Sequence, residues 1–143
     1  MTPPERLRNL LLKVRDSLPN EEFCGVGVVV SRDIQLLPIA SLCTDASLPA
    51  QQDLVEQIAE CSLRSRSCHD GFQILSDKWQ LIQRNQYFAP FPPADFRELI
   101  GSVNVGSRHM AARFGSLIES VVCTGLLSER DGVIVFEGGQ PLD

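Results

Sequence analysis

The sequence predicts an α/β domain in which helices flank a mixed β-sheet, and three observations support this fold class. Segments with helical periodicity alternate with short runs of β-branched residues, which is typical of a sheet covered by helices. The length of 143 residues suits one domain with its own core. With 43% hydrophobic and 22% charged residues, the composition is that of a globular chain. We therefore predict a single domain over residues 1–143.

The first half of the chain predicts helix, strand, turn, strand and helix. Leucine and valine recur at helical spacing over residues 5–18, which indicates an amphipathic helix. The β-branched run at 26–30 and the apolar run at 34–39 are separated by Ser-Arg-Asp, which predicts two strands joined by a turn. Apolar residues over 53–64 again follow the helical period, so we expect a second helix there.

The second half predicts two hairpins with helices between them, because apolar runs lie on either side of polar turns. The predicted strands span 72–75, 79–82, 121–127 and 133–136, with 86–89 as a continuation of the first hairpin, and the predicted helices span 94–99 and 108–118. The prolines at 90, 92 and 93 should end the first hairpin, because proline lacks a backbone donor.

Charge and hydropathy exclude several classes of partner. The net charge of −5 does not favour a broad surface for nucleic acid, although a small anionic ligand needs only a local cluster of donors. The apolar runs are too short to span a bilayer, and the first residues lack the basic and apolar parts of a signal peptide. We therefore predict no nucleic-acid or membrane partner and a cytoplasmic location.

The five cysteines show no pattern typical of a shared site. Their number is odd and no pair has C-x-x-C spacing, so we expect neither a zinc site nor a disulfide framework. Cys24 and Cys123 lie in apolar runs and are interpreted as core thiols. Cys68 precedes His69, but adjacent strand residues point to opposite faces, so a Cys–His nucleophile is not favoured.

The most informative segment is Gly106-Ser107-Arg108-His109-Met110-Ala111-Ala112. Glycine and serine permit close approach to an anion, arginine supplies a permanent cation, and histidine adds a donor or a metal ligand. The segment is typical of a loop that enters a helix, where free N–H groups and the helix dipole favour phosphate. The alternative is a surface arginine beside a helix-capping histidine.

A second segment, His69-Asp70-Gly71, gives this loop a partner. A carboxylate on a tight turn can hold a metal ion or act as a base. The alternative is an ordinary hairpin turn, because Asp-Gly is a favoured turn dipeptide.

The order of these segments resembles the diadenylate cyclase domain, which is shared by the DNA-integrity scanning protein and by membrane-linked and sporulation-associated cyclases. The family carries an Asp-Gly-Ala motif, a Gly-Thr-Arg-His-Arg-type motif and a Ser-Glu-Glu-type turn. Similar pieces occur here in the same order at 70–72, 106–110 and 128–130, and the resemblance covers about residues 53–136. It implies a diadenylate-cyclase-like fold and the conversion of two ATP molecules into cyclic di-AMP and two pyrophosphates, with Mg²⁺ or Mn²⁺ as cofactor.

The resemblance also implies roles for individual residues. Asp70, His109 and Glu129 would be catalytic, and Asp70 and His69 would hold the metal. The residues that would bind ATP are Gly71, Phe88, Ala89, Gly106, Ser107, Arg108 and Ser128, with adenine near Phe88 and Ala89.

One bound ATP cannot form the cyclic dinucleotide alone. Two protomers have to present their nucleotides face to face, so that each 3′-hydroxyl lies in line with the α-phosphorus of the other ATP. The resemblance therefore implies ATP as substrate and a homodimer or higher homo-oligomer with the site at the interface.

The chain departs from the family pattern at three positions. Phe72 replaces an alanine and is expected to point into the core. Met110 replaces the second arginine of the phosphate motif, a loss of charge for which Arg113 is a candidate substitute. Arg130 replaces an acid, although Asp131 follows. The alternative function is therefore an inactive adenine-nucleotide sensor of the same fold, and a third is an unrelated structural domain.

Overall fold

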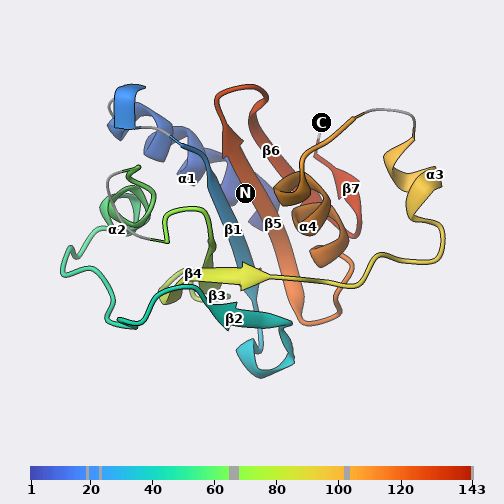
Figure 1. Cartoon of the computed structure of the whole chain (residues 1–143), viewed down its shortest axis with the longest axis horizontal. Coiled ribbons are helices and arrows are strands. Elements are labelled where there is room, and N and C mark those ends of the chain that lie inside the picture. The colour runs from blue at the N-terminus through green and yellow to red at the C-terminus, as the bar shows by residue number, and fades with distance from the viewer. Residues whose placement is uncertain (19, 23, 65–67, 102–103, 143) are drawn as a thin grey trace.

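The computed structural model describes residues 1–18, 20–22, 24–64, 68–101 and 104–142. They form a seven-stranded sheet with helices on both faces (Figure 1). The strand order is β2-β4-β3-β1-β5-β6-β7. β1 pairs with β3 in parallel, and the other described neighbours pair antiparallel. The predicted α/β class, with a mixed sheet between helices, is therefore confirmed.

The bounds of the elements are as follows. The strands are β1 (Val26–Ser31), β2 (Ile39–Ser41), β3 (Phe72–Ser76), β4 (Leu81–Phe88), β5 (Val121–Ser128), β6 (Gly132–Glu137) and β7 (Gln140–Pro141). The helices are α1 (Pro3–Ser17), α2 (Leu54–Cys61), α3 (Phe96–Ile100) and α4 (Ser107–Gly115), with short 3₁₀ helices at Asn20–Glu22 and Ile34–Leu36.

β1 lies at the centre of the sheet and is buried along its whole length. Because successive side chains of a strand point to opposite faces, Val28 and Val30 pack against α1 and α2, whereas Val29 packs on the face that α4 covers. Burial on both faces explains why the run is apolar without the alternation of a half-exposed strand.

α1 covers one face through a stripe of fully buried side chains, Leu7, Leu11 and Val14. A capping box fixes its start: the Glu5 amide donates to the Thr2 hydroxyl, and the Thr2 amide donates to the Glu5 carboxylate. On the opposite face α4 packs against β1 and β5. Its buried Ala112 accepts a hydrogen bond from the Thr124 hydroxyl through the backbone carbonyl.

The prediction of a strand over 34–39 is wrong. Residues Ile34–Leu36 form a 3₁₀ helix, and the strand that follows is only Ile39–Ser41. The cause is local, because the Asp33 carboxylate accepts a hydrogen bond from the Gln35 amide at 3.0 Å and caps the helical turn. Capping outweighs the β-propensity of this apolar run.

The other predicted elements form near their expected positions. The helix predicted over 53–64 ends at Cys61, and the one predicted over 108–118 ends at Gly115. β4 includes residues 86–88 of the continuation predicted at 86–89, and the short strand β7 was not predicted. Within the described ranges, no helix is both long and apolar enough to cross a membrane.

The expectation that the cysteines form no disulfide is also wrong. Cys43 and Cys68 are joined by a disulfide, with their Cα atoms 5.7 Å apart. Their separation of 25 residues carries no local pattern. The pair meets because β2 and β3 both hydrogen-bond to β4, which brings the loop after β2 to the segment before β3. Cys68 therefore has no free thiol for a Cys–His nucleophile.

Candidate functional site

The pairing register brings segments that are distant in sequence to one end of the central strands. The first residue of β1 lies opposite the end of β5 through the pair Val26↔Leu127. β3 begins beside β1 through the pair Gly27↔Phe72. The residues that precede β1, precede β3 and end β5 therefore meet at this end of the sheet.

A cavity of about 1000 Å³ opens there, and we call it the site cavity. The residues that the sequence analysis assigned to catalysis, ATP or metal all line it. They are His69, Asp70, Gly71, Phe88, Ala89, Gly106, Ser107, Arg108, His109, Ser128 and Glu129. The three motifs thus share one cavity, which is the first requirement of a common site.

Residues 68–71, which we call the Asp70 turn, lead directly into β3. The turn does not join two paired strands, so the hairpin alternative is excluded. Cys68 has a left-handed backbone, with φ of 58°, and its carbonyl accepts from the Gly71 amide at 3.4 Å. Asp70 is exposed and lines the cavity, so a ligand can reach its carboxylate.

Asn85 of β4 holds the Asp70 turn in place. The sequence analysis did not identify this residue. It is 1% exposed, and its side-chain amide donates to the carbonyls of Cys61, at 3.0 Å, and Cys68, at 2.8 Å. A Cβ added to Gly71 would lie 2.6 Å from the Asn85 carbonyl carbon, so only glycine fits there. The available signal was a polar stretch, Arg84-Asn85-Gln86, within an otherwise strand-like segment.

Arg108 joins the two main motifs. Its guanidinium donates to the backbone carbonyl of Asp70 at 2.6 Å. It lies against Gly25, where an added Cβ would be 2.5 Å from an Arg108 nitrogen. Burial lowers the pKa of Arg108, although Cys24 and Asp70 act in the opposite direction. The side chain is half-buried and therefore differs from the surface charge of the alternative interpretation.

The first turn of α4 lies at the site cavity. The helix begins at Ser107 after Gly106, and no side chain in the described part of the chain forms a capping hydrogen bond there. The first amides of a helix have no partner within the helix, and the dipole is positive at this end. Since Gly106, Ser107 and Arg108 line the cavity, these groups form a region that favours an anion.

His109 is half-buried at the wall of the cavity, where its ring meets the Phe136 ring edge-on at 5.2 Å between centroids. Burial lowers its pKa below the ordinary value of 6.5; Arg113 lowers it further, and Asp131 opposes the shift. The imidazole is therefore neutral near pH 7, with one donor and one acceptor nitrogen.

Two departures from the family pattern can now be located. Phe72 is 4% exposed and packs against Phe88 with 5.2 Å between ring centroids, as expected for a core residue. Met110 lines the cavity, whereas Arg113 does not. Arg113 donates to the Gly139 carbonyl at 2.9 Å and lies over the Phe136 ring, so it cannot replace the missing cation.

Cys24 corrects a further expectation. It is half-buried, lines the site cavity and donates to the Ser62 carbonyl at 3.1 Å. Burial raises its pKa, so the thiol is neutral at pH 7. Cys123 is a core thiol as predicted, with its pKa raised to about 12 by burial.

The described residues hold no group of three or more His, Cys, Asp or Glu side chains that could bind a metal ion by themselves. Mg²⁺ at a nucleotide site, however, usually takes one or two carboxylates and completes its shell with phosphate oxygens and water. Asp70 and Glu129, both exposed on the cavity, are oxygen donors of that kind. These two carboxylates are therefore candidate metal ligands.

We predict that Gly71→Ala lowers the free energy of unfolding by about 2–3 kcal/mol, because the new methyl group meets backbone that cannot move aside. Urea denaturation measures the change. Gly106→Ala is the matched control, since nothing lies within 4 Å of its added Cβ, and the altered cap should cost about 1 kcal/mol or less. Equal losses in the two variants would contradict the packing argument.

We predict that His109 titrates below pH 6.5, measured by NMR of its ring protons. Arg113→Gln should raise this pKa, and Asp131→Asn should lower it. The unfolded chain binds the proton more readily, so the contribution of His109 to stability is complete above about pH 6.5 and falls as the pH drops through the folded pKa. A titration at or above 6.5 would show that burial does not control this residue.

No protein-family model matches the sequence, and a search of curated proteins finds no significant match. Solved structures share the fold. One is the hypothetical membrane spanning protein from Bacillus cereus, with a TM-score of 0.63 and 16% identity over 98% of this chain. This chain spans 62% of the length of that protein.

A second solved structure is DacA from Staphylococcus aureus, determined as a double cysteine mutant. It has a TM-score of 0.55 and 16% identity, and the match covers 97% of this chain and 83% of DacA. Identity this low shows the fold alone. The mixed seven-stranded sheet with flanking helices is therefore a DacA-like fold.

Proposed function

We propose that this chain is a diadenylate cyclase, which joins two ATP molecules into cyclic di-AMP and releases two pyrophosphates. The observation that carries the proposal is the shared cavity, because the Asp70 turn, the start of α4 and the end of β5 line it together. The likeness to DacA supports a diadenylate-cyclase-like fold, in agreement with the resemblance of the motifs.

The site cavity offers candidate neighbours for the adenine and for the phosphates of ATP. Its volume of about 1000 Å³ is at the upper end of the range for small-molecule sites. Phe88 and Ala89 line it and would lie near adenine. The phosphates would lie at the N-terminus of α4, near Ser107 and Arg108, where backbone amides and the guanidinium favour negative charge.

The reaction needs a proton acceptor and stabilisation of phosphate charge. Asp70 would accept the proton of the attacking 3′-hydroxyl or hold Mg²⁺ or Mn²⁺, with His69 as a second candidate ligand. The metal, when bound, supplies neutralisation of phosphate charge. Glu129 would orient water or the metal, and neutral His109 would donate a hydrogen bond to a phosphate oxygen.

The chemistry requires two copies of the chain. The 3′-oxygen of each ATP attacks the α-phosphorus of the other, the bond to the pyrophosphate oxygen breaks, and pyrophosphate leaves. Each site holds one nucleotide, so two cavities have to face each other in a symmetric dimer. Asp70, Ser107 and Glu129 are exposed around the cavity and would lie toward the partner.

A nucleotide sensor without cyclase activity is the second candidate, and Met110 favours it. The Met110 side chain lines the cavity at the position where the family carries an arginine. Arg113 donates its hydrogen bond to the Gly139 carbonyl instead. A cavity that keeps Arg108 but lacks this second cation can bind ATP and still stabilise the transition state poorly.

We predict that the purified chain forms cyclic di-AMP from ATP with Mn²⁺ or Mg²⁺, as detected by chromatography. Asp70→Asn should reduce turnover at least about a hundredfold, since it removes a positioned acid–base group. Asp77→Asn is the matched control, because Asp77 is an exposed turn carboxylate that does not line the cavity. If Asp70→Asn turns over as fast as the parent, the assignment of Asp70 is wrong.

We predict that Met110→Arg raises turnover, or lowers the ATP concentration required, by about tenfold, the scale of one charge-assisted hydrogen bond. Gln83→Arg adds the same charge at an exposed position outside the cavity and should have little effect. Tighter ATP binding by calorimetry without product would favour the sensor. No response of either quantity would mean that Met110 does not face the phosphates.

A further inference from the structure

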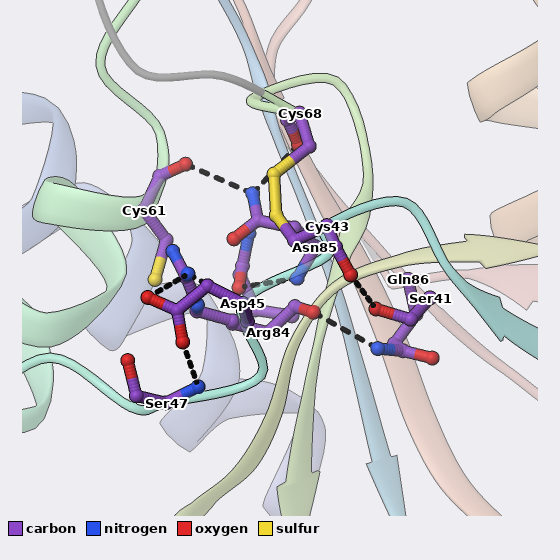
Figure 2. Close-up of a disulfide and its surroundings, with 10 residues drawn as sticks. Ser41, Cys43, Asp45, Ser47, Cys61, Cys68, Arg84, Asn85 and Gln86 are labelled. Atoms are coloured by element: carbon purple, nitrogen blue, oxygen red, sulfur yellow. Dashed lines mark hydrogen bonds and ion pairs between the residues drawn. A yellow bond between two sulfur atoms is a disulfide. The ribbon is translucent and has the colours of Figure 1, made fainter.

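The Cys43–Cys68 disulfide lies beside the proposed catalytic carboxylate. Figure 2 shows that it ties the loop after β2 to the Asp70 turn. One residue separates Cys68 from Asp70 along the chain. Both cysteines are partly exposed, so neither lies in the closed interior of the domain. A covalent bond at this position therefore acts directly on the segment that carries Asp70.

Cys68 is held in a conformation that it would otherwise avoid. Its φ of 58° is left-handed, which is unfavourable for a residue with a side chain. Besides the disulfide, two hydrogen bonds restrain it, because its carbonyl accepts from the Asn85 side chain at 2.8 Å and from the Gly71 amide at 3.4 Å. Asn85 in turn contacts Gly71 and accepts from the Leu42 amide at 3.1 Å, next to Cys43. The disulfide and Asn85 thus restrain the same turn from two sides.

The core of the fold does not depend on this disulfide. Neither Cys43 nor Cys68 belongs to the two buried apolar clusters, whereas Cys61 and Cys123 do. Loss of the bond would therefore change the loop and the turn while the sheet and its helices persist.

Other contacts hold the loop that carries Cys43 in place. Arg84 forms an ion pair with Asp45 at 3.7 Å and donates to its carbonyl at 2.7 Å, which holds the loop on β4 (Figure 2). The Ser41 hydroxyl donates to the Cys43 carbonyl at 2.9 Å. The loop therefore stays near the turn, and the bond can form again.

We propose that Cys43 and Cys68 form a reversible thiol–disulfide site that controls the Asp70 turn, with a dithiol as its reductant. A thiolate of the dithiol attacks one sulfur and breaks the Cys43–Cys68 bond, and its second thiol releases the protein from the mixed disulfide. The chain gains two electrons and two protons as two thiols, and the dithiol becomes a disulfide. In the reverse exchange a disulfide is the oxidant: it accepts the two electrons and two protons as two thiols, and the Cys43–Cys68 bond forms again. The oxidised chain has the ordered turn and the higher activity.

This regulation rests on the proposed cyclase function, so the test has a readout that does not need turnover. The oxidised chain, the chain treated with dithiothreitol and the reoxidised chain are compared. Hydrogen exchange of residues 68–71 reports the turn, calorimetry reports ATP affinity, and chromatography reports cyclic di-AMP. The double variant Cys43→Ser/Cys68→Ser keeps Cys24, Cys61 and Cys123 and controls for reaction at other thiols.

Reduction should accelerate exchange in residues 68–71 and leave β1 and β5 protected. It should also lower turnover by about ten- to a hundredfold, because small displacements of a catalytic group cost this much. Reoxidation should reverse both effects. The double variant should resemble the reduced chain, and dithiothreitol should change neither its hydrogen exchange nor its turnover.

Unchanged exchange in the turn, or a response that persists in the double variant, would overturn the redox site. If no redox state forms cyclic di-AMP, the cyclase function fails instead. The redox site is then judged by hydrogen exchange of residues 68–71 alone.

Discussion

The register of β1 against its two neighbours is the constraint on which the rest of the structure depends. β1 is buried on both faces, so a slip of one residue would turn Val28 and Val30 toward the wrong helix layer. Core packing therefore fixes the register. The same register sets where β3 begins and where β5 ends, and these two points carry the Asp70 turn and Ser128. The shape of the site cavity is thus a consequence of how the core packs.

The site cavity brings charges of both signs together within an acidic chain. The net charge is −5, and the cavity is lined by Arg64, Arg108 and Arg130, by Asp70, Glu129 and Asp131, and by the positive end of α4. The guanidinium of Arg108 donates a hydrogen bond to a backbone carbonyl and not to a carboxylate. This hydrogen bond therefore does not neutralise the positive charge of Arg108. This arrangement suits a small anion at the cavity, while the overall charge still disfavours a long polyanion.

Much of the fold could be predicted because its signals are local. The double-faced burial of β1 appears as a continuous β-branched run, and α1 appears as an apolar stripe at helical spacing. The segment at 34–39 was misassigned because one capping side chain, Asp33, outweighed the apolar pattern. Periodicity measures the average of a segment and does not register a single hydrogen bond.

The sequence motifs of the candidate site could be recognised in advance. The residues that hold those motifs in place could not. The motif residues line one cavity, but Asn85 and the Cys43–Cys68 bond depend on β4 lying between β2 and β3. Neighbours in a sheet are set by tertiary packing, which no local pattern encodes. Arg108 was assigned to phosphate from its residue type, whereas its bond to the Asp70 carbonyl could be seen only once the two segments met.

The two outermost strands have a consequence for how copies of this chain meet. β2 has three residues and β7 has two, the latter including Pro141, which has no backbone donor. Short edges of this kind expose few unpaired amides and carbonyls for another strand to join. At these two strands, therefore, a second copy of the chain finds little backbone with which to extend the sheet.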